Sequence, residues 1–319
     1  MRSNPIGQPM PEVMGSFDAP LKGILIVSFG IMIFAVQDVI IRHLSSDYSA
    51  MQIMFIRGLV AIVFISLFVY WEGGLPSLGI EHPVLNGLRG VLMVTSYTTY
   101  YMSLAALPIA EVTAIFFVAP LIVTMFSALF LGEIVGIRRW SAVFVGFIGV
   151  MVIVQPGSRT IDMAALLPLV GAVTYAASII ITRYIGHTQT GSSLAFIAMG
   201  IFVIVSGTAG FVMGDGSFGT DYHPSLTFLF RSWIVPETRD LLFLTACGLI
   251  SACGFYCLSQ GYRIAPASVV APFEYIAMPM AVISGFLFWQ EVPTFFTLAG
   301  ISLIVGSGLY ILRKEAARS

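Results

Sequence analysis

The sequence is poor in charge, cysteine and histidine, and each shortage excludes a class of protein. Charged residues are 10% of the chain, where an ordinary soluble domain has about 25%. The formal net charge is −1, so there is no basic excess to hold nucleic acid. The 3 cysteines share one apolar stretch, which argues against a secreted disulfide scaffold. No histidine or carboxylate joins them at ligand spacing, so we expect no metal site and no cofactor.

The sequence is correspondingly rich in apolar residues. They make up 58% of the 319 residues, and the mean hydropathy is +0.95. A single soluble core stops growing at about 250–300 residues and cannot hide this much apolar surface. The apolar runs are continuous rather than alternating, which excludes a membrane barrel. The composition therefore predicts an all-α polytopic membrane protein.

The apolar runs divide into ten predicted transmembrane helices, since a bilayer core needs about 20 residues per helix. They are 21–42, 50–71, 84–106, 108–131, 137–155, 162–185, 191–213, 239–262, 266–289 and 293–312. Residues 1–20 and 313–319 are expected to be cytoplasmic tails, the first of them disordered. The widest connection, 214–238, is expected to hold a short interfacial helix near 226–230.

Lys and Arg favour cytoplasmic termini, because cytoplasmic segments carry the excess of these residues. That orientation places nine of them inside, namely Arg2, Lys22, Arg138, Arg139, Arg183, Arg263, Arg313, Lys314 and Arg318. It places five outside, namely Arg42, Arg57, Arg159, Arg231 and Arg239. We therefore predict a multi-pass protein of the inner (cytoplasmic) membrane.

The two halves of the chain repeat one another. Pro108 and Glu133 are 25 positions apart, as are Pro266 and Glu291, and an apolar span with small residues follows each pair. Five spans per repeat is an odd number, so 21–155 and 162–312 are expected to be inverted in the membrane, as in many transporters. The small residues of these spans also allow a homodimer; they are Ala142, Gly146, Ser302 and Gly306.

Prolines interrupt corresponding spans in the two halves. Pro120 lies in 108–131, and Pro272 and Pro279 lie in 266–289. Each removes a backbone hydrogen bond and clashes with the preceding turn. Paired interruptions of this kind indicate a binding site between the repeats. The alternative interpretation is a packing kink without a ligand.

These features resemble the drug/metabolite transporter superfamily, in its ten-helix EamA type. The likeness covers about 21–312 and rests on motifs around Arg57, Arg89, Pro120, Glu133 and Glu291, and on the segment 265–275. It implies two inverted five-helix repeats around a central site for a small polar organic solute. The first repeat has Phe116-Phe117 where the second has Glu274-Tyr275, so the halves are chemically unequal.

Charged residues at membrane depth are the candidate site, because a charge there costs about 2.5–3.5 kcal/mol on insertion scales. Glu274 is the leading candidate to bind substrate or carry a coupling proton, unless it is the structural partner of an arginine such as Arg89. Arg89 is a candidate for an anionic substrate group, with snorkelling to the surface as the alternative.

Four charged residues are candidates for gating or coupling. Asp38 is expected to pair with Arg42 or Arg57 at the outer mouth, or to form a static ion pair there. Glu111 is the fourth candidate, although an acid at a helix start also serves the dipole.

Aromatic residues offer a wall for a flat ligand. They are 13% of the chain, and rings from the repeat-related spans are able to stack on a planar solute. The alternative is packing or a lipid-facing surface. The candidates for substrate contact are Tyr97, Tyr100, Tyr101, Phe117, Phe273 and Tyr275.

The sequence thus predicts a secondary transporter that works by alternating access rather than an enzyme. No phosphate-binding glycine loop of the Walker type is found. The partners are a small-molecule substrate, a coupling proton or counter-substrate, and the bilayer. A planar vitamin such as riboflavin is the first substrate hypothesis; an amino acid, an amine or an S-adenosylmethionine-like metabolite is the second. A membrane-embedded enzyme or scaffold is a remote alternative.

Overall fold

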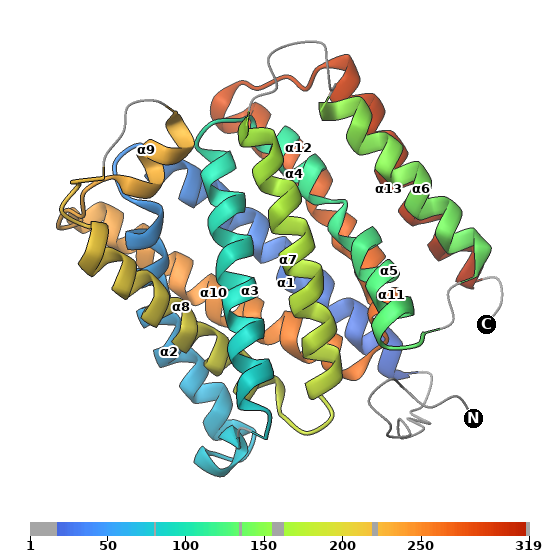
Figure 1. The fold of residues 1–319 in the computed structure, drawn as a ribbon, viewed down its shortest axis with the longest axis horizontal. Helices are drawn as coiled ribbons and strands as arrows, with labels where there is room; N and C mark the ends of the chain where they lie inside the picture. Colours follow the sequence, from blue (N-terminus) through green and yellow to red (C-terminus); the bar gives the residue numbers. More distant parts are fainter. Residues whose placement is uncertain (1–17, 80, 134–135, 155–162, 219–222, 317–319) are drawn as a thin grey trace.

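The computed structural model describes residues 18–79, 81–133, 136–154, 163–218 and 223–316, and in these ranges the regular structure is helical throughout. Figure 1 shows the helices as a bundle in which segments from both halves lie side by side. The bounds of the α-helices and of the 3-10 helices η1–η3 are α1 Asp18–Leu44, α2 Ala50–Trp71, η1 Leu75–Leu78, α3 Pro83–Leu104, α4 Ile109–Phe116, α5 Ala119–Phe130, α6 Ile137–Val154, η2 Met163–Leu166, α7 Leu167–Ile185, α8 Gly191–Met213, α9 Pro224–Phe230, α10 Thr238–Ile264, α11 Ala267–Val270, η3 Ala271–Ile276, α12 Ala277–Trp289 and α13 Phe295–Ala316.

Seven stretches of the described residues are long and apolar enough to cross a membrane, so this is a multi-pass membrane protein. Shorter apolar helices cover Phe144–Ile153 and Phe295–Ser307, inside two of the ten predicted spans. α3 has the length but not the apolarity, because it carries Asn86 and Arg89 among several hydroxyl residues. Both of these polar side chains are buried in the bundle.

The ends of the predicted segments differ in part from the structure. α1 begins at Asp18 and α13 ends at Ala316, so the last residues of the predicted N-terminal tail and the first of the predicted C-terminal tail are helical. The rest of both predicted tails, 1–17 and 317–319, lies outside the described residues. The helix expected near 226–230 is confirmed as α9.

Two predicted spans are broken inside the bundle. α4 ends at Phe116 and α5 starts at Ala119. Pro120 has no N–H to give to the carbonyl of Phe116, so the α-helical ladder cannot continue there. In the second half, α11 turns into the 3-10 segment η3, which contains Pro272, and α12 follows.

Helices from the two halves pack closely against each other. α1 lies along α10, α3 along α7, and α6 along α13, and Figure 1 shows the last pair at one edge of the bundle. Gly149 and Gly300 bring α6 and α13 together: a Cβ at Gly149 would lie 2.8 Å from the carbonyl oxygen of Gly300. Gly146, predicted for a dimer, faces Leu121 and Ser307 of the same chain instead.

Candidate membrane-embedded binding site

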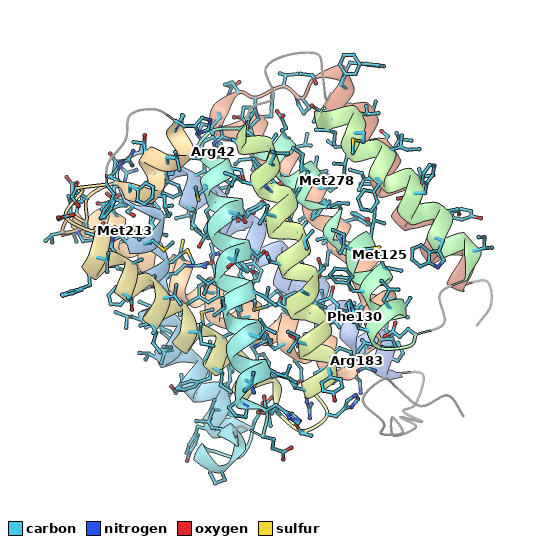
Figure 2. All side chains as sticks on the ribbon, in the orientation of Figure 1. Arg42, Met125, Phe130, Arg183, Met213 and Met278 are labelled. Carbon is cyan, nitrogen blue, oxygen red and sulfur yellow. The ribbon has the colours of Figure 1, made fainter. Side chains whose placement is uncertain are left out.

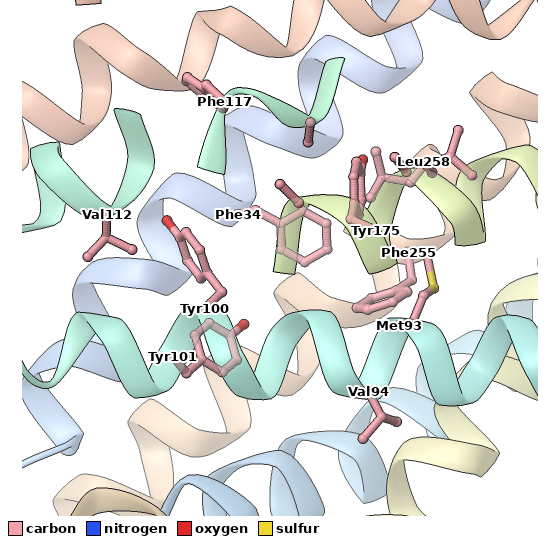
Figure 3. Close-up of a cluster of buried hydrophobic side chains, with 14 of the residues drawn as sticks. Phe34, Met93, Val94, Tyr100, Tyr101, Val112, Phe117, Tyr175, Phe255 and Leu258 are labelled. Atoms are coloured by element: carbon pink, nitrogen blue, oxygen red, sulfur yellow. The ribbon is translucent and has the colours of Figure 1, made fainter. Parts of the chain in front are cut away.

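A cavity lies between α1, α3, α4, α7, α10 and the broken second-half span. Six of the fourteen lining residues are aromatic, and Figure 3 shows four of them, Phe34, Tyr100, Tyr175 and Phe117, close together. Its polar lining comes from Asp38, Ser96, Thr113, Glu274 and tyrosines, and no Lys, Arg or His of the described ranges takes part. The full lining is Ile31, Phe34, Ala35, Asp38, Ser96, Tyr97, Tyr100, Thr113, Phe116, Phe117, Tyr175, Leu258, Glu274 and Ala277.

The cavity is narrow in this conformer. Its volume is about 70 Å³, whereas pockets for drug-sized ligands measure about 300–1,000 Å³. An organic metabolite therefore fits only when the surrounding helices move apart.

Glu274 is held by two tyrosines. Tyr175 of α7 donates to its Oε1 at 2.7 Å, and Tyr262 of α10 donates to the same oxygen. Its other oxygen, Oε2, has no hydrogen-bond partner among the described residues. The tyrosines fix the carboxyl group in place and leave one acceptor oxygen for a ligand.

Asp38 supplies a second carboxyl group to the same cavity. Tyr100 of α3 donates to its Oδ2 at 2.9 Å, and the Tyr100 hydroxyl also lies 3.2 Å from that of Thr113. Oδ1 has no hydrogen-bond partner in the described part of the chain. Among the described residues, Asp38 forms no ion pair with Arg42 or Arg57 within 4.0 Å. Asp38 accepts a hydrogen bond from Tyr100 instead, while Arg42 pairs with Glu291 and Arg57 donates to Tyr101.

Arg57 is fully buried behind the cavity wall rather than at a mouth. Its guanidinium carbon lies 5.1–5.4 Å from the ring centres of Tyr97, Tyr101 and Phe202, where cation–π attraction offsets part of its desolvation. Nη1 donates to the Tyr101 hydroxyl at 2.9 Å.

The amide of Gln37 completes this cluster. Its oxygen accepts from Arg57 Nη1 and from the Tyr101 hydroxyl, each at 2.8 Å, while its nitrogen donates to Ser251. This orientation follows from the neighbours, since only an acceptor suits a guanidinium. Tyr101 therefore serves the Arg57 cluster and does not line the cavity, unlike Tyr97 and Tyr100.

The two broken spans meet through equivalent residues. Phe117 and Tyr275 are 158 positions apart, the same as Pro108 and Pro266 (275 − 117 = 266 − 108). Their rings make an edge contact with centres 5.6 Å apart. Phe117 lines the cavity, whereas Tyr275 packs behind it and Phe273 is not part of the lining.

Arg89 lies apart from the cavity and holds helices together. Its Nε donates to Thr182 at 2.6 Å, its Nη1 to the Leu194 carbonyl at 2.8 Å and its Nη2 to Ser259 at 3.0 Å. The side chain is 1% exposed, so the structure shows neither snorkelling nor a partnership with Glu274.

Arg42 pairs with Glu291 instead of Asp38. Its guanidinium also lies over the Trp289 ring, 4.7 Å from the centre. Glu111 occupies the first turn of α4 and is not part of the cavity lining. Of the four predicted gating residues, only Asp38 therefore lies in the cavity wall.

Sequence reasoning missed Tyr175, Tyr262, Ser96 and Thr113. The first two hold Glu274, and the other two line the cavity. The available signal was a single phenol or hydroxyl at mid-span among apolar and small residues. That signal is weak without knowing which helix face points inward.

A second, apolar groove opens on the surface formed by α1, α10 and α12. It includes Val36, His43, Phe243, Met280 and Trp289. Among the described residues, Ala35 alone is part of the lining of both this groove and the central cavity. The methyl side chain of Ala35 therefore lies where the groove and the central cavity come closest.

A further polar cluster, formed by Glu72, Ser192 and Tyr256, lies between the end of α2 and the start of α8. Glu72 accepts from the backbone N–H of Ser192 at 3.1 Å, from its hydroxyl at 2.6 Å and from Tyr256 at 2.7 Å. Partial burial raises the pKa of Glu72, but these hydrogen bonds outweigh it and leave the pKa below its usual value. The carboxylate also faces the positive end of the α8 dipole.

Comparison with known proteins identifies the family of this bundle. The sequence profile of the EamA-like transporter family matches twice, at residues 21–155 and 162–313. The chain belongs to this family. It is therefore a transporter of the drug/metabolite transporter superfamily and not an enzyme.

Several curated relatives of this EamA-like protein carry names of transporters. The riboflavin transporter of Rhizobium johnstonii is 30% identical over 77% of this chain and 75% of its own. The S-adenosylmethionine uptake transporter of Rickettsia prowazekii is 23% identical over 92% and 94%. The pseudopaline exporter CntI of Pseudomonas aeruginosa is 26% identical over 92% and 97%.

A solved structure shares the fold. It matches 94% of this chain and 98% of its own with a TM-score of 0.64 at 16% identity. This likeness concerns the fold alone.

Proposed function

We propose that this protein is a secondary transporter that binds a small ring-bearing cation in the central cavity and moves it by alternating access. One observation carries the proposal: two carboxyl groups, Asp38 and Glu274, line one cavity with aromatic walls, and no basic side chain of the described residues is part of that lining. Each carboxyl group keeps one oxygen free for a donor from the ligand. An ionised carboxylate at this depth is costly unless a cation offsets it.

The proposed frame is ten spans in two inverted repeats of five, within 21–155 and 162–312. The two family matches and the 158-residue offset between the broken spans support it. We place the protein in the inner (cytoplasmic) membrane with both termini cytoplasmic, on the Lys and Arg distribution. Uphill transport then needs a coupling proton or a counter-substrate.

S-Adenosylmethionine is the ligand that these features favour. It joins a flat heterocycle to a sulfonium, an ammonium and a carboxylate group, so its net charge is positive. The rings of Tyr97, Tyr100 and Phe116 offer faces for the heterocycle, and the free carboxylate oxygens offer partners for the cations. A relative over most of the chain is named for its uptake.

Riboflavin is the second candidate. The aromatic walls suit its flat ring system, and a relative at 30% identity is named for this vitamin. Its ring is uncharged, so it binds the carboxyl groups only through hydrogen bonds. The charge of the ligand therefore discriminates the two candidates.

Flux into proteoliposomes tests the proposal, with labelled S-adenosylmethionine and riboflavin offered with and without a pH gradient. We expect S-adenosylmethionine flux that Glu274→Gln and Asp38→Asn each reduce about tenfold or more. The matched control is Glu237→Gln, an exposed acid at the start of α10 outside the cavity lining.

Three outcomes decide between the candidates. Riboflavin flux alone, unaffected by either amide variant, contradicts a cationic substrate and supports the vitamin. Flux lost equally in the Glu237 control contradicts a role for the cavity acids. Absence of flux for both solutes and for a panel of amines contradicts the proposed substrate class.

A further inference from the structure

One end of the bundle is held by Glu291, which joins the end of one broken span to the start of the other. Glu291 lies just after α12 and accepts from the backbone N–H of Ile109, at the start of α4, at 3.2 Å. The same carboxylate forms the ion pair with Arg42. We call these contacts the Glu291 latch.

The opposite end carries the counterpart. Glu133, which follows α5, accepts from the backbone N–H of Ser268 at 3.4 Å and from its hydroxyl, at the start of α11. We call these contacts the Glu133 latch. Arg183, in the last turn of α7, is the arginine that corresponds to Arg42 at this end. Figure 2 shows Arg42 and Arg183 at opposite ends of the bundle.

The two latches occupy equivalent places in the halves. Glu133 and Glu291 are 158 positions apart (291 − 133), as are Pro108 and Pro266. Arg42 and Arg183 are 141 apart (183 − 42). The same shift relates the ends of α1 and α7 (185 − 44) and the starts of α2 and α8 (191 − 50).

Each glutamate therefore binds the start of the broken span in the other half. The contacts that break at the Glu291 end have chemically equivalent contacts that can form at the Glu133 end. A protein that alternates between two conformers needs equivalent contacts of this kind.

The latches differ in the state of their arginine. Arg42 is engaged with Glu291, the one ion pair within 4.0 Å in the described part of the chain. Arg183 is not so engaged: it donates to the carbonyl of Arg263, at the end of α10, at 2.7 Å. The Glu133 latch thus holds through Ser268 without its arginine.

We propose that the two latches alternate, so that Arg183 pairs with Glu133 when Arg42 releases Glu291. This inference rests on the proposed alternating access and names the residues that exchange. A transporter needs two conformers of similar free energy, since a large difference traps it in one of them. Exchanging one arginine–glutamate pair for an equivalent one changes the facing direction and leaves the number of ion pairs the same.

Thiol labelling from each membrane face tests this exchange. The reporter is Ala277→Cys in the cavity wall, in a protein whose Cys247, Cys253 and Cys257 are replaced by alanine. A membrane-impermeant maleimide is applied to intact spheroplasts and to inverted vesicles, and the ratio of the two labelling rates is the readout.

The arginine variants are expected to shift that ratio in opposite directions. Arg42→Gln raises labelling from the Glu291 end, and Arg183→Gln raises it from the Glu133 end, each by about fivefold or more. The double variant returns toward the parent ratio. The control is Arg239→Gln, an exposed arginine at the start of α10, which leaves the ratio unchanged.

The opposite findings are equally clear. Single variants that shift the ratio in the same direction, or leave it unchanged while the protein stays folded, overturn the exchange. Should either glutamine variant fail to fold, Arg42→Lys and Ser268→Ala give milder versions of the same comparison. Labelling needs no transported solute, so missing flux refutes the proposed function without affecting this ratio.

Discussion

At the scale of single residues, the position of Glu274 depends on tyrosines that sequence patterns do not single out. Glu274 was recognisable because a lone acid between two prolines inside an apolar run is costly. Tyr175 and Tyr262 were not, because a tyrosine in a membrane helix is as common in packing as in binding. Asp38 was identified, but its partner depended on how α1 and α3 turn toward each other.

Removing one tyrosine hydroxyl tests this positioning. Tyr262 touches Glu274 without lining the cavity, so Tyr262→Phe acts on the substrate only through the carboxylate. We expect about a tenfold rise in KM for flux with little change in thermal stability. Leu258→Met, which alters the cavity wall without a hydrogen bond, is the comparison. A Tyr262→Phe protein with wild-type KM contradicts the positioning role.

The Glu72 cluster predicts a pH-dependent stability difference. Because its folded-state pKa is depressed, its contribution is present above the unfolded pKa and is lost as pH falls through the lower folded value. Glu72→Gln is therefore expected to lower Tm by about 2 °C at pH 7, after allowing for partial solvent screening. Thermal unfolding across pH checks this. A difference that grows as pH falls below about 4 is the contrary result.

At the scale of helices, apolar length predicted most elements, and Pro120 and Pro272 mark where the inner ones break. Pro279, also predicted to interrupt its span, lies instead in the first turn of α12, where a missing N–H leaves the helix intact.

The helix α3 fits the predicted span 84–106 in length, but its mean hydropathy alone does not mark it as a span. Its polar residues are matched inside the bundle: Arg89 meets Thr182, Ser259 and the Leu194 carbonyl. The mean hydropathy of a segment is computed from that segment alone, so it does not include hydrogen-bond partners supplied by other helices.

Restoring a continuous helix tests the break between α4 and α5. Pro120→Ala returns the N–H that the Phe116 carbonyl lacks, so stability is expected to stay equal or rise while flux falls severalfold. Pro168→Ala is the matched control, because Pro168 lies in the first turn of α7 where an N–H is unpaired anyway. Flux that is equal in both variants contradicts a functional break.

The contact between α6 and α13 is tested by adding one methyl group. At Gly149 it meets the carbonyl oxygen of Gly300 at 2.8 Å, whereas at Gly306 nothing lies within 4 Å. We expect Gly149→Ala to lower stability by about 1–3 kcal/mol, and Gly306→Ala to have little effect. Unfolding in mild detergent measures both. A larger loss of stability for Gly306→Ala than for Gly149→Ala would contradict this packing of α6 and α13.

At the scale of the whole molecule, the halves are built into one another rather than placed side by side. α1 packs along α10, α3 along α7, and α6 along α13. The repeated spacing of Pro108–Glu133 and Pro266–Glu291 predicted related halves. It did not predict that each glutamate binds the other half, since that contact depends on the position of one repeat against the other.

Separate expression of the halves tests this interlocking. Residues 1–158 and 159–319 are each expected to accumulate poorly alone and to be recovered together as a complex when coexpressed. The reason is that the partner of each helix pair named above lies in the other fragment. Affinity capture through a tag on one fragment, with detection of the other, measures the outcome. Stable accumulation of either fragment alone contradicts it.

The place of Ala35 in the lining of both the central cavity and the surface groove of α1, α10 and α12 has a pharmacological consequence. We expect a lipophilic blocker that dissolves in the bilayer to reach this groove by lateral diffusion and to bind next to the cavity wall. Its potency then follows its partition coefficient and the amount of lipid in the assay, not its aqueous dose alone. Two laboratories using different membrane fractions would measure different inhibitory doses for the same compound, and normalising to lipid would bring them into agreement.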